Sequence, residues 1–203
     1  MKIICVGRNY AKHAKELKNE IPSEPVIFIK PDTALLPKKN PFFYPSFSKD
    51  VHYEVELVIK INKMGKKIQP QFAHKYYNEV SVGIDFTARD VQKQLKEKGL
   101  PWEKAKAFDS SAPVGSFVSL SKFKSIDNIS FSLKLNGELK QEGNTSNMLF
   151  KVNELISYVS SFVTLKKGDL LFTGTPEGVG PVAINDHLEA FIEDEQLLSF
   201  NVK

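Results

Sequence analysis

The chain has 203 residues, of which 41% are hydrophobic and 26% are charged. This composition is typical of a folded protein and too apolar for a disordered one, and the length suits a single domain, expected over residues 1–203. The 28 basic and 24 acidic residues leave a net charge of +4. That surplus is too small to indicate a nucleic-acid-binding protein, which gathers positive charge on one face.

Membrane and disulfide signals are also missing from the sequence. No apolar run approaches the roughly 20 residues that cross a bilayer, so we expect no membrane partner. The N-terminal run MKIICVG is too short for the core of a signal peptide. The single cysteine, Cys5, excludes an internal disulfide and a cysteine-cluster metal site. Together these features predict a cytoplasmic protein.

The N-terminal half predicts strands separated by irregular segments. Residues 2–6 predict a short buried strand, and residues 9–19 predict a helix that Asn9 could cap. The stretch 22–46 contains six prolines, so it can hold one short strand, VIFIK, and is otherwise loop. Residues 51–61 alternate between apolar and more polar side chains, which predicts a strand with one buried face.

The middle of the chain adds a strand, a helix and a hairpin. Residues 79–86 predict a buried strand, and residues 88–98 predict a helix that ends at Gly99. The pair Asn136-Gly137 between two alternating runs is a strong signal for a β-hairpin.

The C-terminal part returns to strands after one helix. Apolar residues at helical spacing predict a helix within residues 146–163. A strand at LLFTG, a glycine-rich loop at residues 173–182 and a final hairpin through EDEQ follow. Strands dominate and helices are few, so the pattern predicts a β-rich α+β fold and not a regular βαβ winding.

Two glutamates on the predicted strand 51–61 are the first candidates for chemistry. Glu54 and Glu56 would project from the same face, about 6–7 Å apart at the backbone. Two carboxylates this close repel each other unless a proton or a cation lies between them, and Mg²⁺ would resolve the repulsion because it prefers oxygen ligands. The alternative is the polar outer face of a half-buried strand, which the pair taken alone favours.

Asp85 strengthens the metal hypothesis. It ends the apolar run VSVGID, where an unpartnered carboxylate pointing into the core would be costly. At the end of a strand that faces a cleft, it could join Glu54 and Glu56 in an all-carboxylate site. The alternative is a cap for the helix that follows. The spacing alone does not show that the three side chains meet.

A histidine and a lysine are candidate catalytic groups. His13 and Glu16 lie three residues apart on a predicted helix, so a carboxylate could orient a general base there, although most such pairs are surface ion pairs. Lys106 lies in a loop that Trp102 and several prolines would order, and it could hold a substrate carboxylate or a developing oxyanion. Lys104 is its rival, and an exposed lysine is the alternative for both.

The glycine-rich loop 173–182 matches no standard phosphate site. It lacks the Gly-Lys-Ser/Thr of a P-loop and the spacing of a dinucleotide-binding turn. Its backbone N–H groups could approach a ligand carboxylate, or the loop could be a tight structural turn. Because the sequence has no GxSxG motif and Cys5 lies in an expected buried strand, nucleophilic catalysis by serine or cysteine has little support.

Six sequence blocks, taken in order, carry a resemblance to a known family. They are GRNYAKHAKEL, HYEVEL, GIDFTARDVQ, KGLPWEKAKAFDSSAPVG, LNGELKQEGNTSNMLF and GDLLFTGTPEGVGPV. The combination closely resembles the fumarylacetoacetate hydrolase superfamily, and most of all its short acylpyruvase and oxaloacetate decarboxylase branch. The resemblance extends from Gly7 to about Phe200.

The resemblance implies roles for particular residues. The family's E-x-E motif and its downstream Asp match Glu54, Glu56 and Asp85, which would bind Mg²⁺ or Mn²⁺. The family's His-x-x-Glu, on a short helix that closes over the site, matches His13 and Glu16.

Further positions follow from the same comparison. The lysine of the family's K-x-F-D block matches Lys106 and not Lys104. The positions that match substrate-side residues of the family are Arg8, Tyr10, Gln92 and Thr175.

The resemblance also implies a fold and an activity. The fold would be α+β, a mixed β-roll or barrel-like core with a few flanking helices, in a homodimer. The activity would be metal-dependent hydrolysis of acylpyruvates, small 2-oxo acids, in which a C–C bond breaks and pyruvate leaves through a metal-stabilised enolate. Decarboxylation of oxaloacetate could use the same site. Two alternatives are an isomerase or tautomerase of unsaturated 2-oxo diacids or oxaloacetate, and a non-catalytic ligand-binding scaffold.

Overall fold

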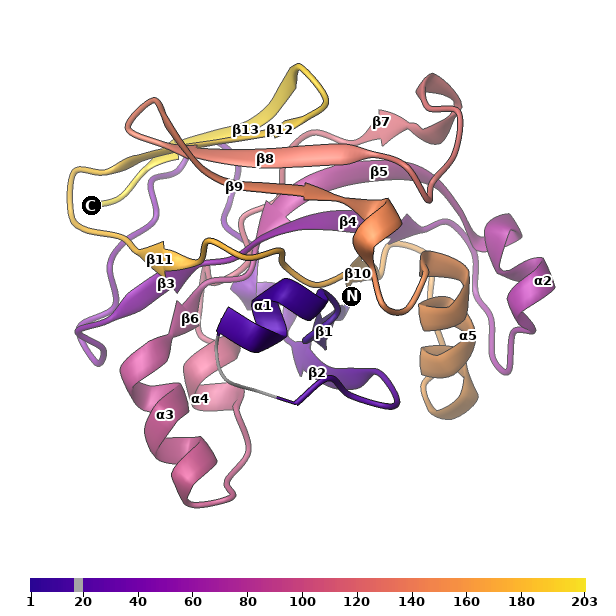
Figure 1. Cartoon of the computed structure of the whole chain (residues 1–203), viewed down its shortest axis with the longest axis horizontal. Coiled ribbons are helices and arrows are strands. Elements are labelled where there is room, and N and C mark those ends of the chain that lie inside the picture. Colours follow the sequence, from indigo (N-terminus) through magenta and orange to yellow (C-terminus); the bar gives the residue numbers. More distant parts are fainter. Residues whose placement is uncertain (17–19) are drawn as a thin grey trace.

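The computed structural model describes residues 1–16 and 20–203, which form an α+β fold (Figure 1). Its strands are β1 (Ile3–Gly7), β2 (Val26–Lys30), β3 (Val51–Tyr53), β4 (Val55–Ile61), β5 (Tyr77–Ile84), β6 (Thr87–Ala88), β7 (Val118–Ser119), β8 (Ser130–Leu135), β9 (Glu138–Asn144), β10 (Leu170–Phe172), β11 (Gly180–Pro181), β12 (His187–Ile192) and β13 (Glu195–Asn201). The α-helices are α1 (Ala11–Glu16), α2 (Pro70–Ala73), α3 (Arg89–Glu97), α4 (Glu103–Lys106) and α5 (Val152–Phe162). Short 3₁₀ turns span Asp32–Ala34, His74–Tyr76, Leu120–Lys122 and Thr145–Asn147.

A mixed six-stranded sheet forms one layer of the molecule. Its strand order is β2-β1-β10-β4-β5-β7, with β1 and β10 parallel and the other pairs antiparallel. Strand β4 lies inside this sheet and is covered on both faces, so the polar outer face expected for residues 51–61 is wrong. The chain also leaves the sheet at Glu54, because β3 belongs to a small separate sheet with β6 and β11.

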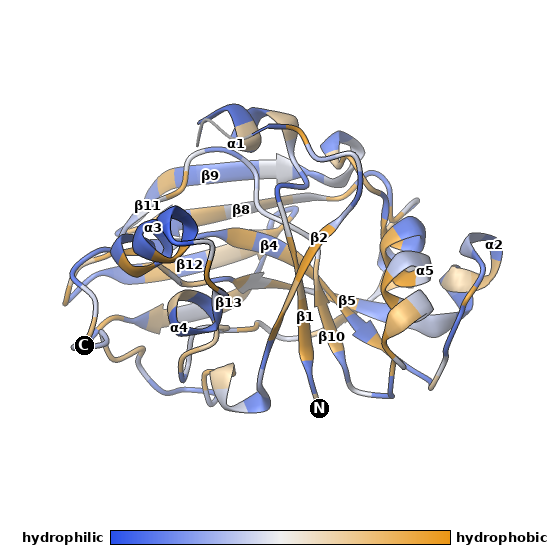
Figure 2. Ribbon diagram, turned by 90° about the horizontal axis from the view of Figure 1, so that it is seen from below, coloured by the Kyte–Doolittle hydropathy of each residue, from blue (hydrophilic) through white to orange (hydrophobic). Residues whose placement is uncertain are grey.

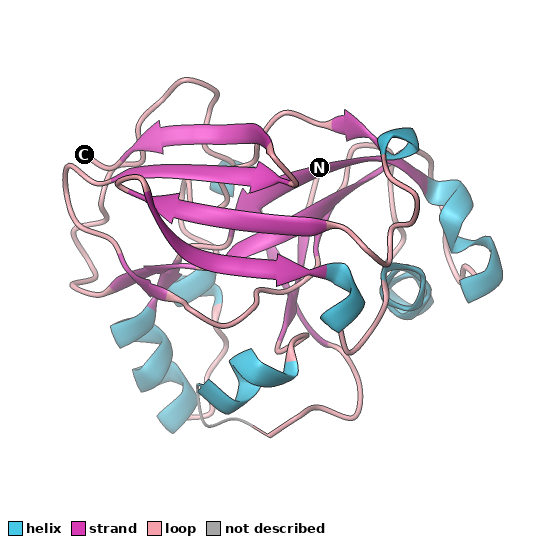
Figure 3. Cartoon of the chain, turned by 45° about the horizontal axis from the view of Figure 1, so that its top comes forward, coloured by secondary structure: helices cyan, strands magenta, loops and turns pink. Residues whose placement is uncertain are grey.

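A four-stranded antiparallel sheet, β13-β12-β8-β9, forms the second layer (Figures 1 and 3). The β8–β9 hairpin turns at Asn136 and Gly137, whose φ angles of 53° and 81° are those of a type I′ turn. Residues of the two sheets share one hydrophobic cluster, in which Leu57 and Val82 of the first sheet join Leu133 of the second. The expected hairpins and α+β class are therefore confirmed, although the described strands form open sheets and no closed barrel.

The helices lie around the sheets and differ in detail from expectation. Figure 2 shows the contrast between hydrophobic strands such as β1 and β10 and the hydrophilic helix α3. Helix α3 ends as the sequence predicts, with Gly99 at φ 62° and the Leu100 N–H bonded to the Leu95 carbonyl. Helix α5 begins only at Val152, because a 3₁₀ turn precedes it. None of the described helices has the length and apolarity to span a membrane.

The expected N-terminal helix is shorter than predicted. Helix α1 ends at Glu16, and residues 17–19 lie outside the described part of the chain. The prediction that Asn9 caps this helix is wrong. Its buried side chain instead donates to the carbonyls of Phe150 and Thr173 and accepts from the Phe150 N–H. Asn9 thus ties the start of α1 to the end of β10, where the glycine-rich loop begins.

Candidate active site

Three carboxylates converge at the end of the central strands. Oxygen atoms of Glu54, Glu56 and Asp85 all lie within 4.8 Å of one another. The side chains are buried, with exposed fractions of 5%, 1% and 1%, so the alternative of an outer polar face is wrong for both glutamates. The alternative of a helix cap is wrong for Asp85, because α3 begins only at Arg89 and the Asp85 carboxylate contacts lysines.

The register of β4 and β5 explains why these residues meet. The two strands are antiparallel, and Val55 is paired with Ile84. One step beyond this pair, the Asp85 N–H donates to the Glu54 carbonyl at 2.8 Å. Asp85 and Glu54 therefore face each other across the strand ends, although they are 31 positions apart in the chain. Glu56 follows on β4 with its side chain toward the same cluster.

The glycine-rich loop supplies a hydrogen bond to the third carboxylate. The Gly174 N–H donates to Glu56 Oε2 at 2.7 Å. Gly174 has a φ of 97°, and a Cβ at this position would lie 2.7 Å from the Cβ of Asn9. Only glycine fits this conformation and this space, which explains why a glycine lies between the two threonines of the TGT segment.

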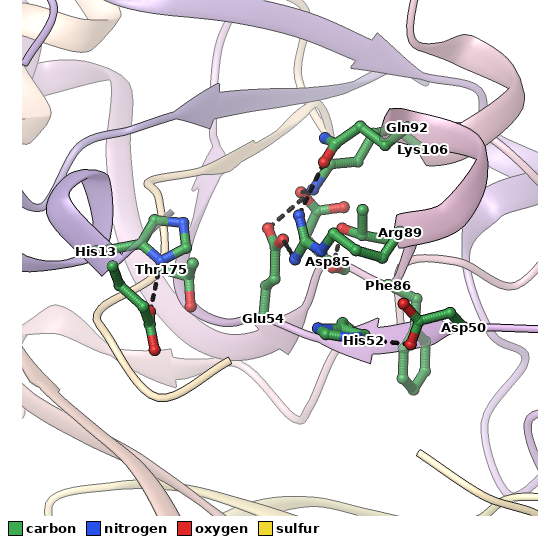
Figure 4. Close-up of polar contacts among 12 residues, drawn as sticks. His13, Asp50, His52, Glu54, Asp85, Phe86, Arg89, Gln92, Lys106 and Thr175 are labelled. Atoms are coloured by element: carbon green, nitrogen blue, oxygen red, sulfur yellow. Dashed lines mark hydrogen bonds and ion pairs between the residues drawn. The ribbon is translucent and has the colours of Figure 1, made fainter. Parts of the chain in front are cut away.

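Three cations contact the carboxylates, and Figure 4 shows two of them, Arg89 and Lys106, beside Glu54 and Asp85. Lys106 Nζ lies 2.8 Å from Glu54 Oε2 and 2.7 Å from Asp85 Oδ2, and so bridges the two residues. Arg89 Nη2 donates to the other oxygen of Glu54. Lys30 Nζ lies 2.6 Å from Asp85 Oδ1, in a close ion pair whose angles are not those of a hydrogen bond.

The ionisation of the carboxylates follows from these contacts. Burial alone would raise the pKa of Glu54, but the charges of Lys106 and Arg89 hold it well below the usual range. Burial and the neighbouring Asp85 raise the pKa of Glu56 well above that range, against the opposing effect of the Gly174 N–H. Burial lowers the pKa of Lys106, but Asp85 and Glu54 outweigh it and the net shift is upward.

This donor set fits a hard divalent cation. All the candidate ligand atoms are carboxylate oxygens, which Mg²⁺ and Mn²⁺ accept and thiophilic metals do not prefer. The Lys106 ammonium already takes the place of a cation between Glu54 and Asp85. A divalent metal would therefore compete with Lys106 for the same oxygens. The buried acidic triad indicates a divalent metal site without distinguishing Mg²⁺ from Mn²⁺.

Most of the residues predicted for the site line one cavity. Its volume is about 30 Å³. The predicted residues in its lining are Arg8, His13, Glu54, Glu56, Asp85, Gln92, Lys106 and Thr175.

Helix α1 brings its histidine and glutamate to the glycine-rich loop. His13 Nδ1 lies 3.3 Å from Glu16 Oε2, and His13 is only 5% exposed whereas Glu16 reaches the surface. Glu16 also accepts the Gly178 N–H at 3.1 Å, and Lys12 forms an ion pair with Glu177 at 3.2 Å. Two contacts therefore dock α1 onto the loop, with His13 facing the cavity.

Two predicted residues have contacts that the sequence did not suggest. Gln92 accepts a hydrogen bond from Arg89 at 2.8 Å and so supports the arginine that holds Glu54. Tyr10 lies outside the lining of this cavity. It borders a separate pocket of about 530 Å³ and packs edge-on against Phe131. Its substrate-binding role stays a prediction.

Sequence reasoning missed two buried polar residues that organise the site. Lys30 is fully buried and joins Asp85 to the backbone carbonyl of Ser111. A lysine closing the apolar run VIFIK was a signal that could have found it. Gln141 of β9 accepts the Val55 N–H and donates to the Thr175 hydroxyl, both at 2.9 Å. Nothing in the local pattern distinguishes it from an ordinary strand glutamine.

The fold is that of a known family. Residues 2–203 match the family described as fumarylacetoacetate (FAA) hydrolase C-terminal, and the chain belongs to this family. It is 47% identical to the mitochondrial oxaloacetate tautomerase of Mus musculus, over 99% of this chain and 91% of the relative. It is 44% identical to an oxaloacetate tautomerase of Escherichia coli, over 97% of this chain and 90% of the relative. A mitochondrial oxaloacetate decarboxylase of Dictyostelium discoideum is 47% identical, over 89% and 84%.

Solved structures agree with this assignment. A fumarylacetoacetate hydrolase family protein from Yersinia pestis superposes with a TM-score of 0.95 at 39% identity, covering 100% of this chain and 93% of the other. The fumarylpyruvate hydrolase of Pseudomonas aeruginosa, solved with Mn²⁺ and pyruvate, superposes with a TM-score of 0.93 at 39% identity, covering 100% and 89%.

Proposed function

We propose that the chain is a divalent-metal-dependent enzyme that hydrolyses acylpyruvates, breaking a C–C bond to release pyruvate, and that the same site decarboxylates oxaloacetate. The observation that carries this proposal is the convergence of Glu54, Glu56 and Asp85 in a cavity that His13 and Lys106 also line. The relatives named for oxaloacetate and fumarylpyruvate support small 2-oxo acids as the substrate class.

Glu54, Glu56 and Asp85 would hold the cation, with Mg²⁺ or Mn²⁺ both suited to an all-oxygen site. A bound divalent cation supplies Lewis-acid stabilisation of negative charge on the 2-oxo acid. The protein's own residues must then deliver the water and manage the protons.

His13 would be the general base for hydrolysis. Its ring faces the cavity, and Glu16 holds Nδ1, so Nε2 is the nitrogen left to take a proton from water. Lys106 would stabilise the oxyanion that forms at the distal carbonyl. Its ammonium uses two of its three N–H donors on Glu54 and Asp85, so one donor is left for a substrate oxygen.

A tautomerase of oxaloacetate is the second candidate. The observation in its favour is the name of relatives that are 44–47% identical over nearly the whole chain. This reaction moves only protons, so it needs a base and charge stabilisation but no water nucleophile. A ligand-binding scaffold remains the third reading, and it would bind metal and 2-oxo acids without turnover.

Thermal shift and product release test these proposals together. We expect Mg²⁺ and Mn²⁺ to raise the melting temperature of protein treated with a chelator, and the loaded protein to release pyruvate from acetylpyruvate. Conversion of enol to keto oxaloacetate, followed by ultraviolet absorbance, measures the tautomerase. Tautomerisation without pyruvate release would reject the hydrolase proposal and support an oxaloacetate tautomerase. Metal binding without either reaction would support the ligand-binding scaffold.

Replacement of His13 should separate hydrolysis from decarboxylation. We expect His13→Ala to lower hydrolysis of acetylpyruvate by about 10²–10⁴-fold, the usual contribution of a general base, and to lower oxaloacetate decarboxylation far less. Lys15→Ala, on the exposed face of the same helix, is the matched control and should change neither rate. Equal losses in both reactions would contradict this role for His13.

The homodimer, the single domain over residues 1–203 and the cytoplasmic location expected from the sequence remain predictions.

A further inference from the structure

A buried glutamine links the strand of the two glutamates to the glycine-rich loop. Gln141 lies on β9 of the second sheet and is 1% exposed. Its Oε1 accepts the Val55 N–H at 2.9 Å, and its Nε2 donates to the Thr175 hydroxyl at 2.9 Å and to the Pro176 carbonyl at 3.0 Å. Because Val55 lies between the two glutamates of the site, one side chain joins both segments.

The strand needs a side chain at this point because β10 has already turned away from β4. The Thr173 N–H still pairs with the β4 backbone, at the Leu57 carbonyl, but the next N–H of the chain bonds the Glu56 carboxylate instead. The Val55 N–H faces the same edge of β4 as Leu57, two residues away, and it is fully buried. A buried N–H requires an acceptor, and Gln141 supplies it.

These contacts leave the Gln141 amide only one orientation. The Val55 N–H can only donate, so it requires the amide oxygen, and the Pro176 carbonyl can only accept, so it requires the amide nitrogen. The second N–H of the same nitrogen then points at Thr175 Oγ1, which must accept it. A hydroxyl that accepts this bond keeps its own proton for another partner.

The hydroxyl proton of Thr175 is available to a ligand. Thr175 is 3% exposed and borders the cavity that holds the three carboxylates. Among residues 1–16 and 20–203, its hydroxyl donates to no acceptor. Without the amide beside it, the hydroxyl could rotate and use its oxygen or its proton equally well. The glutamine therefore determines that this group meets a ligand as a donor.

We propose that Gln141 is a positioning residue that sets the Thr175 hydroxyl as a hydrogen-bond donor to an oxygen of the bound 2-oxo acid. This inference rests on the proposed function and adds to it a residue that does not line the cavity. Gln141 touches no substrate in this account and acts through Thr175.

A double-mutant cycle on oxalate binding tests the proposal. Oxalate is an unreactive mimic of pyruvate enolate, and calorimetry of the Mg²⁺-loaded protein measures its Kd. We expect Thr175→Val to raise this Kd about 10-fold and Gln141→Met to raise it about 5-fold. Because Gln141 acts through the hydroxyl, the double variant should stay near 10-fold and not reach the product of about 50-fold. Losses that multiply would overturn the proposal.

A second variant separates the hydroxyl from the support of the strand. Gln141→Glu keeps an oxygen for the Val55 N–H at nearly the same shape, but the carboxylate would take the Thr175 proton instead of giving one. We expect a weaker affinity for oxalate, and most of this loss should disappear in the Thr175→Val background, where an effect of charge alone would persist. This comparison decides the question if Gln141→Met does not fold. A loss of equal size in both backgrounds would contradict the role of Gln141.

The control and the parent protein separate this inference from the proposed function. Gln196→Met, at an exposed position of β13 in the same sheet as Gln141, should leave the Kd for oxalate unchanged. If the parent binds oxalate but releases no pyruvate from acetylpyruvate, the proposed function fails while the cycle still decides the role of Gln141. If the parent hydrolyses acetylpyruvate and the losses multiply, only this inference fails. A parent that binds no oxalate would overturn it outright.

Discussion

Glu56→Gln should remove metal binding while leaving the metal-free fold intact. Glu56 has no ion-pair partner among the described residues, and burial together with Asp85 raises its pKa. The uncharged amide resembles the protonated acid, and its oxygen can still accept the Gly174 N–H. The free energy of unfolding should therefore change by less than about 1 kcal/mol in chelator. Loss of an anionic ligand should weaken Mg²⁺ binding, and with it activity, by about 100-fold or more.

Glu54→Gln provides the comparison that separates the two glutamates. Glu54 accepts from both Lys106 and Arg89, so its neutralisation leaves buried cations partly unpaired. We expect this variant to lose metal binding and activity as well, but also to lose about 2–3 kcal/mol of stability without metal. Urea unfolding in chelator and metal titration by calorimetry measure both quantities. Full metal affinity in either variant would show that the triad is not the metal site.

Lys30→Met should cause the largest loss of stability at the site. Lys30 is completely buried, and its ammonium contacts Asp85 and the backbone of Ser111. Methionine fills similar volume but leaves the buried Asp85 carboxylate with one fewer cation. It also removes one of the two donors to the Ser111 carbonyl, which keeps the Phe86 N–H. Breaking a buried ion pair from one side costs several kcal/mol, so we expect a loss of about 3 kcal/mol in urea unfolding.

A surface lysine in the same sheet is the matched control. Lys60 of β4 pairs with Glu79 at 2.7 Å, and both side chains are 38% exposed. Because water screens such a pair, Lys60→Met should cost less than about 1 kcal/mol. If the two variants lose the same stability, the ion pair of Lys30 with Asp85 has no special energetic role.

The sequence predicts an element correctly where the backbone conformation of one or two residues determines it. The hairpin at Asn136-Gly137 and the end of α3 at Gly99 depend on the backbone conformation of one or two residues, and both are as expected. The three carboxylates were identified as a possible set from residue type, but their meeting depends on the pairing of β4 with β5, which the spacing alone does not specify.

The remaining features depend on contacts between distant segments. The residues of a strand do not show whether the strand lies inside a sheet or at its surface. For this reason the sequence of β4 is also compatible with Glu54 and Glu56 on a solvent-exposed face. Asn9 could not be recognised as a link to Thr173 and Phe150, because its partners are more than 140 positions away. The same holds for Gln141, which joins the strand of the glutamates to the glycine-rich loop.

The burial of Cys5 has a practical consequence for studying this protein. Its side chain is fully inaccessible in β1, and burial raises the pKa of the thiol well above its usual range, so it should resist alkylation in the folded state. As it is the only cysteine in the chain, a cysteine introduced on the exposed face of α1, for example by Lys15→Cys, would be the sole reactive thiol. A fluorophore attached there would test whether this helix moves as ligands enter, without background labelling.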